Sequence, residues 1–125
     1  MRILVADDDR ELSQLICKIL MGAGHRPIPV FDGASAMMAA MRVPQPDLIL
    51  LDMRMPAGDG QTTLTKLKAA AKSAAIPVMV LTAVPESEIR GTVTALGAEA
   101  FLQKPFEPEQ LLAAVDALQP PPAKR

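Results

Sequence analysis

The chain has 125 residues, the length of one ordinary domain, so we expect a single folded unit. Half of the residues are hydrophobic and 22% are charged, which is typical of a globular protein and excludes a disordered one. The net charge of −1 provides no basic excess for a nucleic-acid backbone, and no apolar run reaches the roughly 18 residues needed to span a bilayer. The single cysteine, Cys17, suits a reducing cytoplasm, where we expect the protein to be located.

Short apolar runs alternate with segments of helical spacing along the whole chain. Apolar runs that are typical of strands occupy residues 3–6, 27–31, 48–51, 76–81 and 98–102. Apolar residues spaced as on one face of a helix occur within residues 12–20, 36–41, 64–67, 89–96 and 111–118.

Five strand–helix units predict an α/β fold of the flavodoxin-like type, a doubly wound parallel sheet of five strands. The second strand contains Pro27 and Pro29, which have no amide hydrogen, so we expect it at an edge of the sheet. The natural strand order is then 2-1-3-4-5. We expect residues 1–118 to form the domain, and the Pro-rich residues 119–125 to be a frayed end or the start of a linker.

Polar residues follow four strands at their carboxyl ends, where open α/β sheets bind ligands. Asp7 and Asp8 come after the first strand, and Asp52 ends the third. Thr82 ends the fourth strand, and Lys104 follows the fifth. Each has an ordinary structural explanation when taken singly. Their convergence at one edge of the sheet favours a binding site.

Three clustered carboxylates require a counter-charge. Two carboxylates about 4 Å apart repel each other by roughly 4 kcal/mol at an effective dielectric constant near 20. A cation or a bound proton must therefore accompany Asp7, Asp8 and Asp52, and an all-oxygen donor set favours Mg²⁺. The ammonium of Lys104 and the hydroxyl of Thr82 suit one further anion. Together these groups predict a site for a phosphoryl group.

Four segments resemble the receiver domain of two-component response regulators: ILVADDD (3–9), PDLILLDMRMPAGDG (46–60), VMVLTA (78–83) and AFLQKPF (100–106). The resemblance covers the chain from residue 3 to about residue 118, and its specificity lies in the order and spacing of the segments. It implies that Asp52 accepts a phosphoryl group from a sensor histidine kinase or a phosphotransfer protein. It also implies that Asp7, Asp8, Asp52 and the backbone carbonyl of Arg54 bind Mg²⁺, for which Mn²⁺ can substitute.

The resemblance also implies which residues respond to phosphorylation. It implies that Thr82, Ala83 and Lys104 bind the phosphoryl oxygens, that Phe101 turns inward as Thr82 moves, and that the Lys104–Pro105 peptide bond is cis. The surface formed by the fourth helix, the fifth strand and the fifth helix would then be recognised by an output protein or by a second copy of the chain. Gly91 lies in the fourth helix within a run of poor helix formers, so we expect this helix to be the most mobile.

Two other functions fit the residues less well. A phosphatase of the haloacid-dehalogenase type needs a second Asp two residues after the first as a general acid, and this chain has Arg54 there. A receiver-like interaction module that works without phosphorylation would lack an acid, the threonine or the lysine, and all are present. We therefore expect a protein that does not act as an enzyme on another substrate and that contacts neither nucleic acid nor membrane directly. The sequence fits either a stand-alone regulator or a domain excised from a longer protein. Arg54, beside the site, is a hypothetical modulator of the lifetime of the acyl phosphate.

Overall fold

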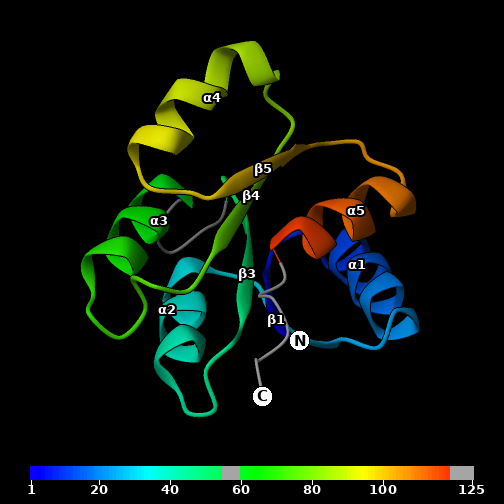
Figure 1. Ribbon diagram of the computed structural model, residues 1–125, viewed down its shortest axis with the longest axis horizontal. Coiled ribbons are helices and arrows are strands. Elements are labelled where there is room, and N and C mark those ends of the chain that lie inside the picture. Colours follow the sequence, from blue (N-terminus) through cyan, green and yellow to red (C-terminus); the bar gives the residue numbers. More distant parts are fainter. Residues whose placement is uncertain (55–59, 119–125) are drawn as a thin grey trace, which may run out of the picture.

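The structure, a computed structural model, describes residues 1–54 and 60–118 and shows a twisted parallel sheet with helices on both faces (Figure 1). The strands are β1 (Arg2–Ala6), β2 (Arg26–Val30), β3 (Leu48–Asp52), β4 (Val78–Thr82) and β5 (Ala100–Gln103). The helices are α1 (Arg10–Gly22), α2 (Gly33–Met41), α3 (Gly60–Ala69), α4 (Glu86–Ala95) and α5 (Pro108–Leu118).

The strand order β2-β1-β3-β4-β5 confirms the prediction from the sequence. The two central strands β3 and β4 are buried along their whole length, which is why they read as continuous apolar runs. Pro27 and Pro29 lie in β2 at the edge of the sheet, opposite Ile3 and Val5 of β1. A missing amide hydrogen bond is tolerated there because only one side of an edge strand is paired.

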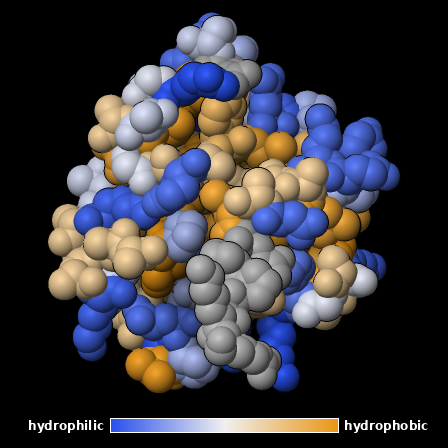
Figure 2. Space-filling model, in the orientation of Figure 1, coloured by the Kyte–Doolittle hydropathy of each residue, from blue (hydrophilic) through white to orange (hydrophobic). Residues whose placement is uncertain are grey.

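Two hydrophobic cores lie on opposite faces of the sheet. Successive side chains of β1 alternate between them: Leu4 packs on the side of α2, α3 and α4, whereas Ile3 and Val5 pack on the side of α1 and α5. The same division of the helices is visible in Figure 1. Figure 2 shows hydrophilic and hydrophobic residues interspersed over the face of the molecule seen in Figure 1.

The helix ends follow local capping rules. The Asp9 side chain accepts a hydrogen bond from the backbone N–H of Leu12 at 3.1 Å and so caps α1, and Asp32 caps α2 in the same way. By contrast, α4 begins after Pro85 with no capping hydrogen bond from a described side chain. Gly97 has φ +94° just after α4, a conformation that favours glycine.

Two strands begin later than their apolar runs. β4 begins at Val78 and not at residue 76, because Ile76 donates to the carbonyl of Ser73 in a turn. β5 begins at Ala100 because the turn at Gly97 continues into Ala98, whose N–H bonds to the carbonyl of Val93. The proposed tail, residues 119–125, and residues 55–59 of the central motif lie outside the described residues. Across residues 1–54 and 60–118, no helix has the length and apolar character to cross a membrane.

Candidate functional site

The carboxylates at the ends of β1 and β3 lie together. The two strands are neighbours, with Ala6 opposite Leu51, so the residues that follow meet at one edge of the sheet. Asp7, Asp8 and Asp52 each contribute a carboxylate oxygen, and these oxygens all lie within 4.8 Å of one another. Hard oxygen donors in this number suit a divalent cation such as Mg²⁺ that keeps several water ligands. The residues present therefore fit the metal expected from the sequence.

Burial differs sharply among the three acids. Asp7 is fully buried and Asp52 is 6% exposed, whereas Asp8 is exposed to solvent. The backbone N–H of Asp9 donates to Asp7 Oδ1 at 2.9 Å, and that of Arg54 donates to Asp52 Oδ1 at 3.2 Å. These bonds hold the two buried carboxylates in fixed orientations.

Lys104 is the cation that contacts the two buried acids. Its Nζ lies 2.9 Å from Asp7 Oδ2 and 3.6 Å from Asp52 Oδ1. Because Lys104 follows β5, this contact joins residues from the first and last strands of the chain across the edge of the sheet. The ammonium offsets part of the negative charge of the acid cluster.

The charge of Asp52 remains unfavourable in spite of Lys104. Burial and, second, the neighbouring Asp7 raise the pKa of Asp52 to about 6, while Lys104 and the N–H of Arg54 act in the opposite direction. A metal ion at the cluster would lower that pKa and keep the carboxylate ionised at neutral pH. This is the protonation state that a nucleophilic carboxylate needs.

Thr82 and Ala83 line the same site from the end of β4. Thr82 is buried, and its hydroxyl oxygen accepts a hydrogen bond from the N–H of Val84 at 3.0 Å. Its carbonyl accepts from the N–H of Lys104 at 2.7 Å, which ties the two phosphate-binding candidates to each other. A cavity of about 310 Å³ lies between these groups and is lined by Asp7, Asp8, Asp9, Asp52, Arg54, Thr82, Ala83 and Lys104.

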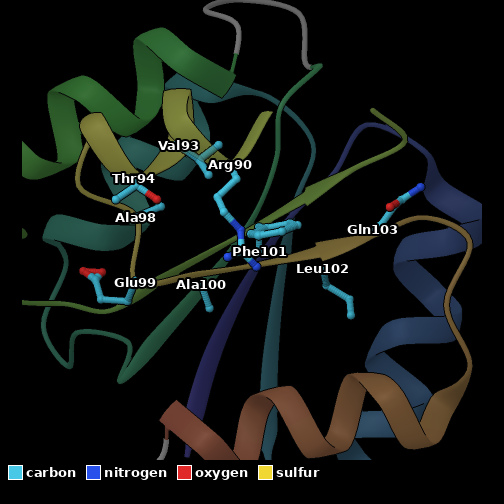
Figure 3. Close-up of a pocket in the computed structure, with 9 residues that line it drawn as sticks. All are labelled: Arg90, Val93, Thr94, Ala98, Glu99, Ala100, Phe101, Leu102 and Gln103. Atoms are coloured by element: carbon cyan, nitrogen blue, oxygen red, sulfur yellow. The ribbon is translucent and has the colours of Figure 1, made fainter. Parts of the chain in front are cut away.

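Two residues named from the sequence lie apart from this cavity. Phe101 lines a different cavity, between α4 and β5, where Arg90 reaches from α4 toward the ring (Figure 3). Pro105 lines an apolar groove that adjoins the acidic cavity and shares Lys104 with it. The Lys104–Pro105 peptide bond is cis, and so is the Val43–Pro44 bond, which was not expected from the sequence.

The sequence did not predict the role of Gly60. This glycine is the first residue of α3, and its backbone packs against the end of β3. A Cβ atom there would lie 2.5 Å from the carbonyl oxygen of Asp52 and 2.7 Å from the carbonyl carbon of Met53. Only glycine allows this approach. The available signal was the glycine that ends the central motif PDLILLDMRMPAGDG (46–60).

The parallel sheet and its acidic cavity define the class: an α/β protein whose clustered carboxylates, at the carboxyl edge of the sheet, fit a divalent cation. The model of the response regulator receiver domain matches residues 3–116, and the chain belongs to that family. Receiver domains are phosphoacceptors of two-component signalling, and they bind Mg²⁺ in an acidic pocket of this kind. The resemblance seen in the sequence is thus confirmed.

Curated bacterial proteins contain a similar domain. The chain is 38% identical over 117 residues to the phosphate regulon transcriptional regulatory protein PhoB of Klebsiella pneumoniae, covering 94% of the chain and 51% of that protein. It is also 38% identical to the DNA-binding dual master transcriptional regulator RpaA of Synechocystis, covering 94% of the chain and 48% of that protein. The chain therefore spans about half the length of these curated relatives.

Solved structures match the fold closely. The chemotaxis protein CheY4 of Vibrio cholerae has a TM-score of 0.87 and 27% identity, with 94% of this chain and 98% of that chain covered. The receiver domain of the sensor histidine kinase PA1611 from Pseudomonas aeruginosa, with a magnesium ion coordinated in its active site cleft, has a TM-score of 0.85 and 28% identity, covering 94% and 95% of the two chains.

Proposed function

We propose that Asp52 accepts a phosphoryl group from a phosphohistidine on a sensor histidine kinase or phosphotransfer protein, giving an acyl phosphate. The observation that carries this proposal is the cluster of three carboxylate oxygens within 4.8 Å, with Lys104 Nζ 2.9 Å from one of its acids. Asp7, Asp8, Asp52 and the backbone carbonyl of Arg54 would hold Mg²⁺ or Mn²⁺. Such an ion, when bound, offsets the charge on the transferred phosphoryl oxygens.

The chain's own residues account for the transfer. A carboxylate oxygen of Asp52 attacks the phosphorus, the phosphorus–nitrogen bond of the donor breaks, and its electron pair returns to the donor imidazole. The hydrogen bond from the Arg54 N–H to Oδ1 orients the nucleophile. Lys104 lies within reach of the phosphoryl oxygens and stabilises their charge. The chain would promote only its own phosphorylation and dephosphorylation, without acting on a further substrate.

An apolar groove next to the cavity supports a protein as the donor. The groove has a volume of about 450 Å³, and it shares Ala83 and Lys104 with the acidic cavity. Leu15 of α1, which lines this groove, is 52% exposed. A small phosphodonor needs no such surface, whereas a protein that brings a phosphohistidine to Asp52 must cover the adjoining groove. The groove is lined by Leu12, Leu15, Ile19, Ala83, Lys104, Pro105, Phe106 and Pro108.

The switch begins at Thr82 and Lys104. Phosphoryl oxygens on Asp52 would compete with the bonds that these residues now make, which are the Val84 N–H to the threonine oxygen and the Lys104 ammonium to Asp7. The loop after β4 then closes toward the site, and Phe101 moves in response. The surface of α4, β5 and α5 changes shape and is recognised by an output protein or by a second copy of the chain.

The cellular location and the output partner of the protein are part of this proposal. The relatives PhoB and RpaA are named as transcriptional or DNA-binding regulators, and this chain matches only about half of each. A cytoplasmic location and output through protein contacts, without direct binding to nucleic acid, are proposed for the segment described here. The alternative function is an interaction module that is never phosphorylated. It would need the same fold, but it would not explain why three carboxylates are clustered.

Intact-mass measurement of phosphorylation by acetyl phosphate tests the proposal. Wild type should gain one phosphoryl group when Mg²⁺ is present and none after chelation. Asp52→Asn should gain none, whereas the control Asp9→Asn, which lies at the same cavity, should be modified like wild type. An adduct that persists in Asp52→Asn would place the acceptor elsewhere. No adduct on wild type under any condition, including transfer from phosphorylated kinase, would favour the interaction module.

A further inference from the structure

Arg90 and Phe101 face each other across the space between α4 and β5. The guanidinium carbon of Arg90 lies 5.7 Å from the centroid of the Phe101 ring, within the range of a cation–π interaction. Both residues line a cavity of about 480 Å³, and Figure 3 shows the arginine extending from α4 to the ring. The phenylalanine is only partly buried, with one side against the core under α4. Its orientation is therefore set by α4 as well as by the core.

The loop between α4 and β5 is tied to α3 and to the start of β4. Lys68 donates to both carboxylate oxygens of Glu99, which follows α4, and to the carbonyls of Ala74 and Ile76 at 3.2 and 2.9 Å. Glu99 also accepts from the N–H of Val78 at 3.1 Å, at the start of β4. This network fixes the connection between α4 and β5.

The N-terminal half of α4 is held less firmly. No described side chain caps it after Pro85, and Gly91 weakens the helix directly after Arg90. A Cβ at Gly91 would have no described atom within 4 Å, so packing does not compensate for the glycine. Arg90 thus lies between the anchored end of the helix and the end nearest the β4–α4 loop. Its contact with the ring links the position of α4 to that of Phe101.

We infer that Arg90 is a positioning residue, which holds the Phe101 ring in its partly buried orientation beneath α4 and so opposes the reorientation that accompanies phosphorylation. This inference rests on the proposed function for the phosphorylated state, whereas the restraint on the ring holds in the unmodified protein. An exposed cation–π contact changes an equilibrium by about two- to five-fold. Arg90 therefore adjusts the balance between two states and leaves the chemistry at Asp52 unchanged.

Aromatic ¹H–¹³C NMR of phenylalanine tests the restraint directly. The chain has three phenylalanines and no tyrosine or tryptophan, so the ring signals are few and can be assigned by substitution. Arg90→Met removes the cation and keeps a straight side chain suited to a helix. We expect the Phe101 signals to move and the ratio of its χ1 rotamers to change by about two- to five-fold. Arg90→Lys, which keeps a cation, should restore part of the wild-type pattern.

The chain offers a matched control. Arg10 lies over the ring of Phe31 at 4.0 Å, a second cation–π contact in another part of the molecule. Arg10→Met should move the signals of Phe31 and leave those of Phe101 in place, and Arg90→Met should do the reverse. If Arg90→Met leaves the Phe101 rotamers as in wild type, the inference is wrong. A change in both rings would show a general loss of structure and would also overturn it.

Phosphorylation separates this inference from the proposed function. After acetyl phosphate and Mg²⁺, the Phe101 signals of wild type should move in the direction that Arg90→Met already produces in the unmodified protein. The mass of the adduct should be the same in both proteins. Movement in the opposite direction would overturn the opposing role of Arg90. Failure of any adduct to form would contradict the proposed function, while the spectra of the unmodified variants would still decide whether Arg90 restrains the ring.

Discussion

Lys104 Nζ lies 2.9 Å from Oδ2 of Asp7, a carboxylate with no solvent exposure. The two residues are 97 positions apart, and each follows a strand at the same edge of the sheet. The lysine neutralises a buried acid in the unmodified protein, and under the proposed function it would also bind a phosphoryl group on Asp52. Asp7 and such a phosphoryl group would compete for the same ammonium.

Lys104→Met should destabilise the metal-free protein and strengthen its affinity for Mg²⁺. Removing one partner of a buried ion pair leaves an uncompensated charge, which costs about 3 kcal/mol. The loss of the ammonium also removes a repulsion of the incoming cation. Urea unfolding and calorimetric titration with Mg²⁺ measure the two effects. Lys18→Met, at an exposed position of α1, is the control, and weaker Mg²⁺ binding by the Lys104 variant would contradict the prediction.

Asp52 should make the stability of the metal-free protein depend on pH. Its pKa is raised from 3.8 to about 6 in the fold, mainly by burial, so the unfolded chain loses this proton at lower pH than the folded one. Stability is then lost as pH rises from about 4 to 6 and is constant above that range. Asp52→Asn removes this term, and at pH 7.5 it should be more stable than wild type by on the order of 2 kcal/mol.

Unfolding of both proteins at several pH values, with and without Mg²⁺, checks the pH prediction. The advantage of Asp52→Asn should shrink toward pH 4, because folded wild-type Asp52 is protonated there and the unfolded chain is only partly ionised. It should also shrink when Mg²⁺ is added at pH 7.5. A constant difference between the two proteins from pH 4 to pH 7.5 would show that burial of the Asp52 charge is not its cause.

Asp8→Asn should weaken Mg²⁺ binding at least tenfold, because it removes one of the three clustered carboxylates. The metal-free variant should be as stable as wild type or slightly more stable, since repulsion within the cluster is relieved. Calorimetric titration measures the affinity. Asp9→Asn is the matched control, because Asp9 lines the same cavity but lies outside the cluster, and asparagine also caps a helix. Equal losses in both variants would refute a site built on Asp8.

Arg54→Ala should change the lifetime of the acyl phosphate without changing the acceptor. The Arg54 side chain is exposed and lines the cavity, where it can contact phosphoryl oxygens or obstruct water. Its backbone N–H, which bonds to Asp52, is kept in the variant. Loss of the adduct after removal of acetyl phosphate, followed by intact mass, should be several-fold faster. An unchanged rate would exclude a role for the side chain.

Two glycines should respond to alanine in opposite directions. Gly60→Ala places a Cβ against the backbone of Asp52 and Met53 and should destabilise the protein by roughly 2 kcal/mol or more. Gly91→Ala fills an exposed helical position with open space around it and should stabilise the protein by about 0.5 to 1 kcal/mol. Thermal and urea unfolding measure both. Similar effects at the two positions would contradict the packing described at the end of β3.

Local signals in the sequence were sufficient for the fold and for the position of the site. Continuous apolar runs identified β3 and β4, the prolines of β2 identified an edge strand, and parallel strands bring their carboxyl ends to one edge. The proximity of Asp7, Asp8 and Asp52 followed from that topology alone, because β1 and β3 are neighbours. Periodicity and chain connectivity carry this information without any knowledge of side-chain packing.

Packing between distant segments decided the rest. Asp7 and Asp8 are identical neighbours in the sequence, yet the first is fully buried and the second is exposed, because successive residues after a strand point in different directions. The contact of Arg90 with Phe101 depends on where α4 lies over β5, and hydrophobic periodicity does not specify that placement. The sequence by itself determined the strand order and the meeting of Asp7, Asp8 and Asp52 at one edge of the sheet. Only the tertiary structure decided the partner of each charge, because burial and distance arise when separate elements pack together.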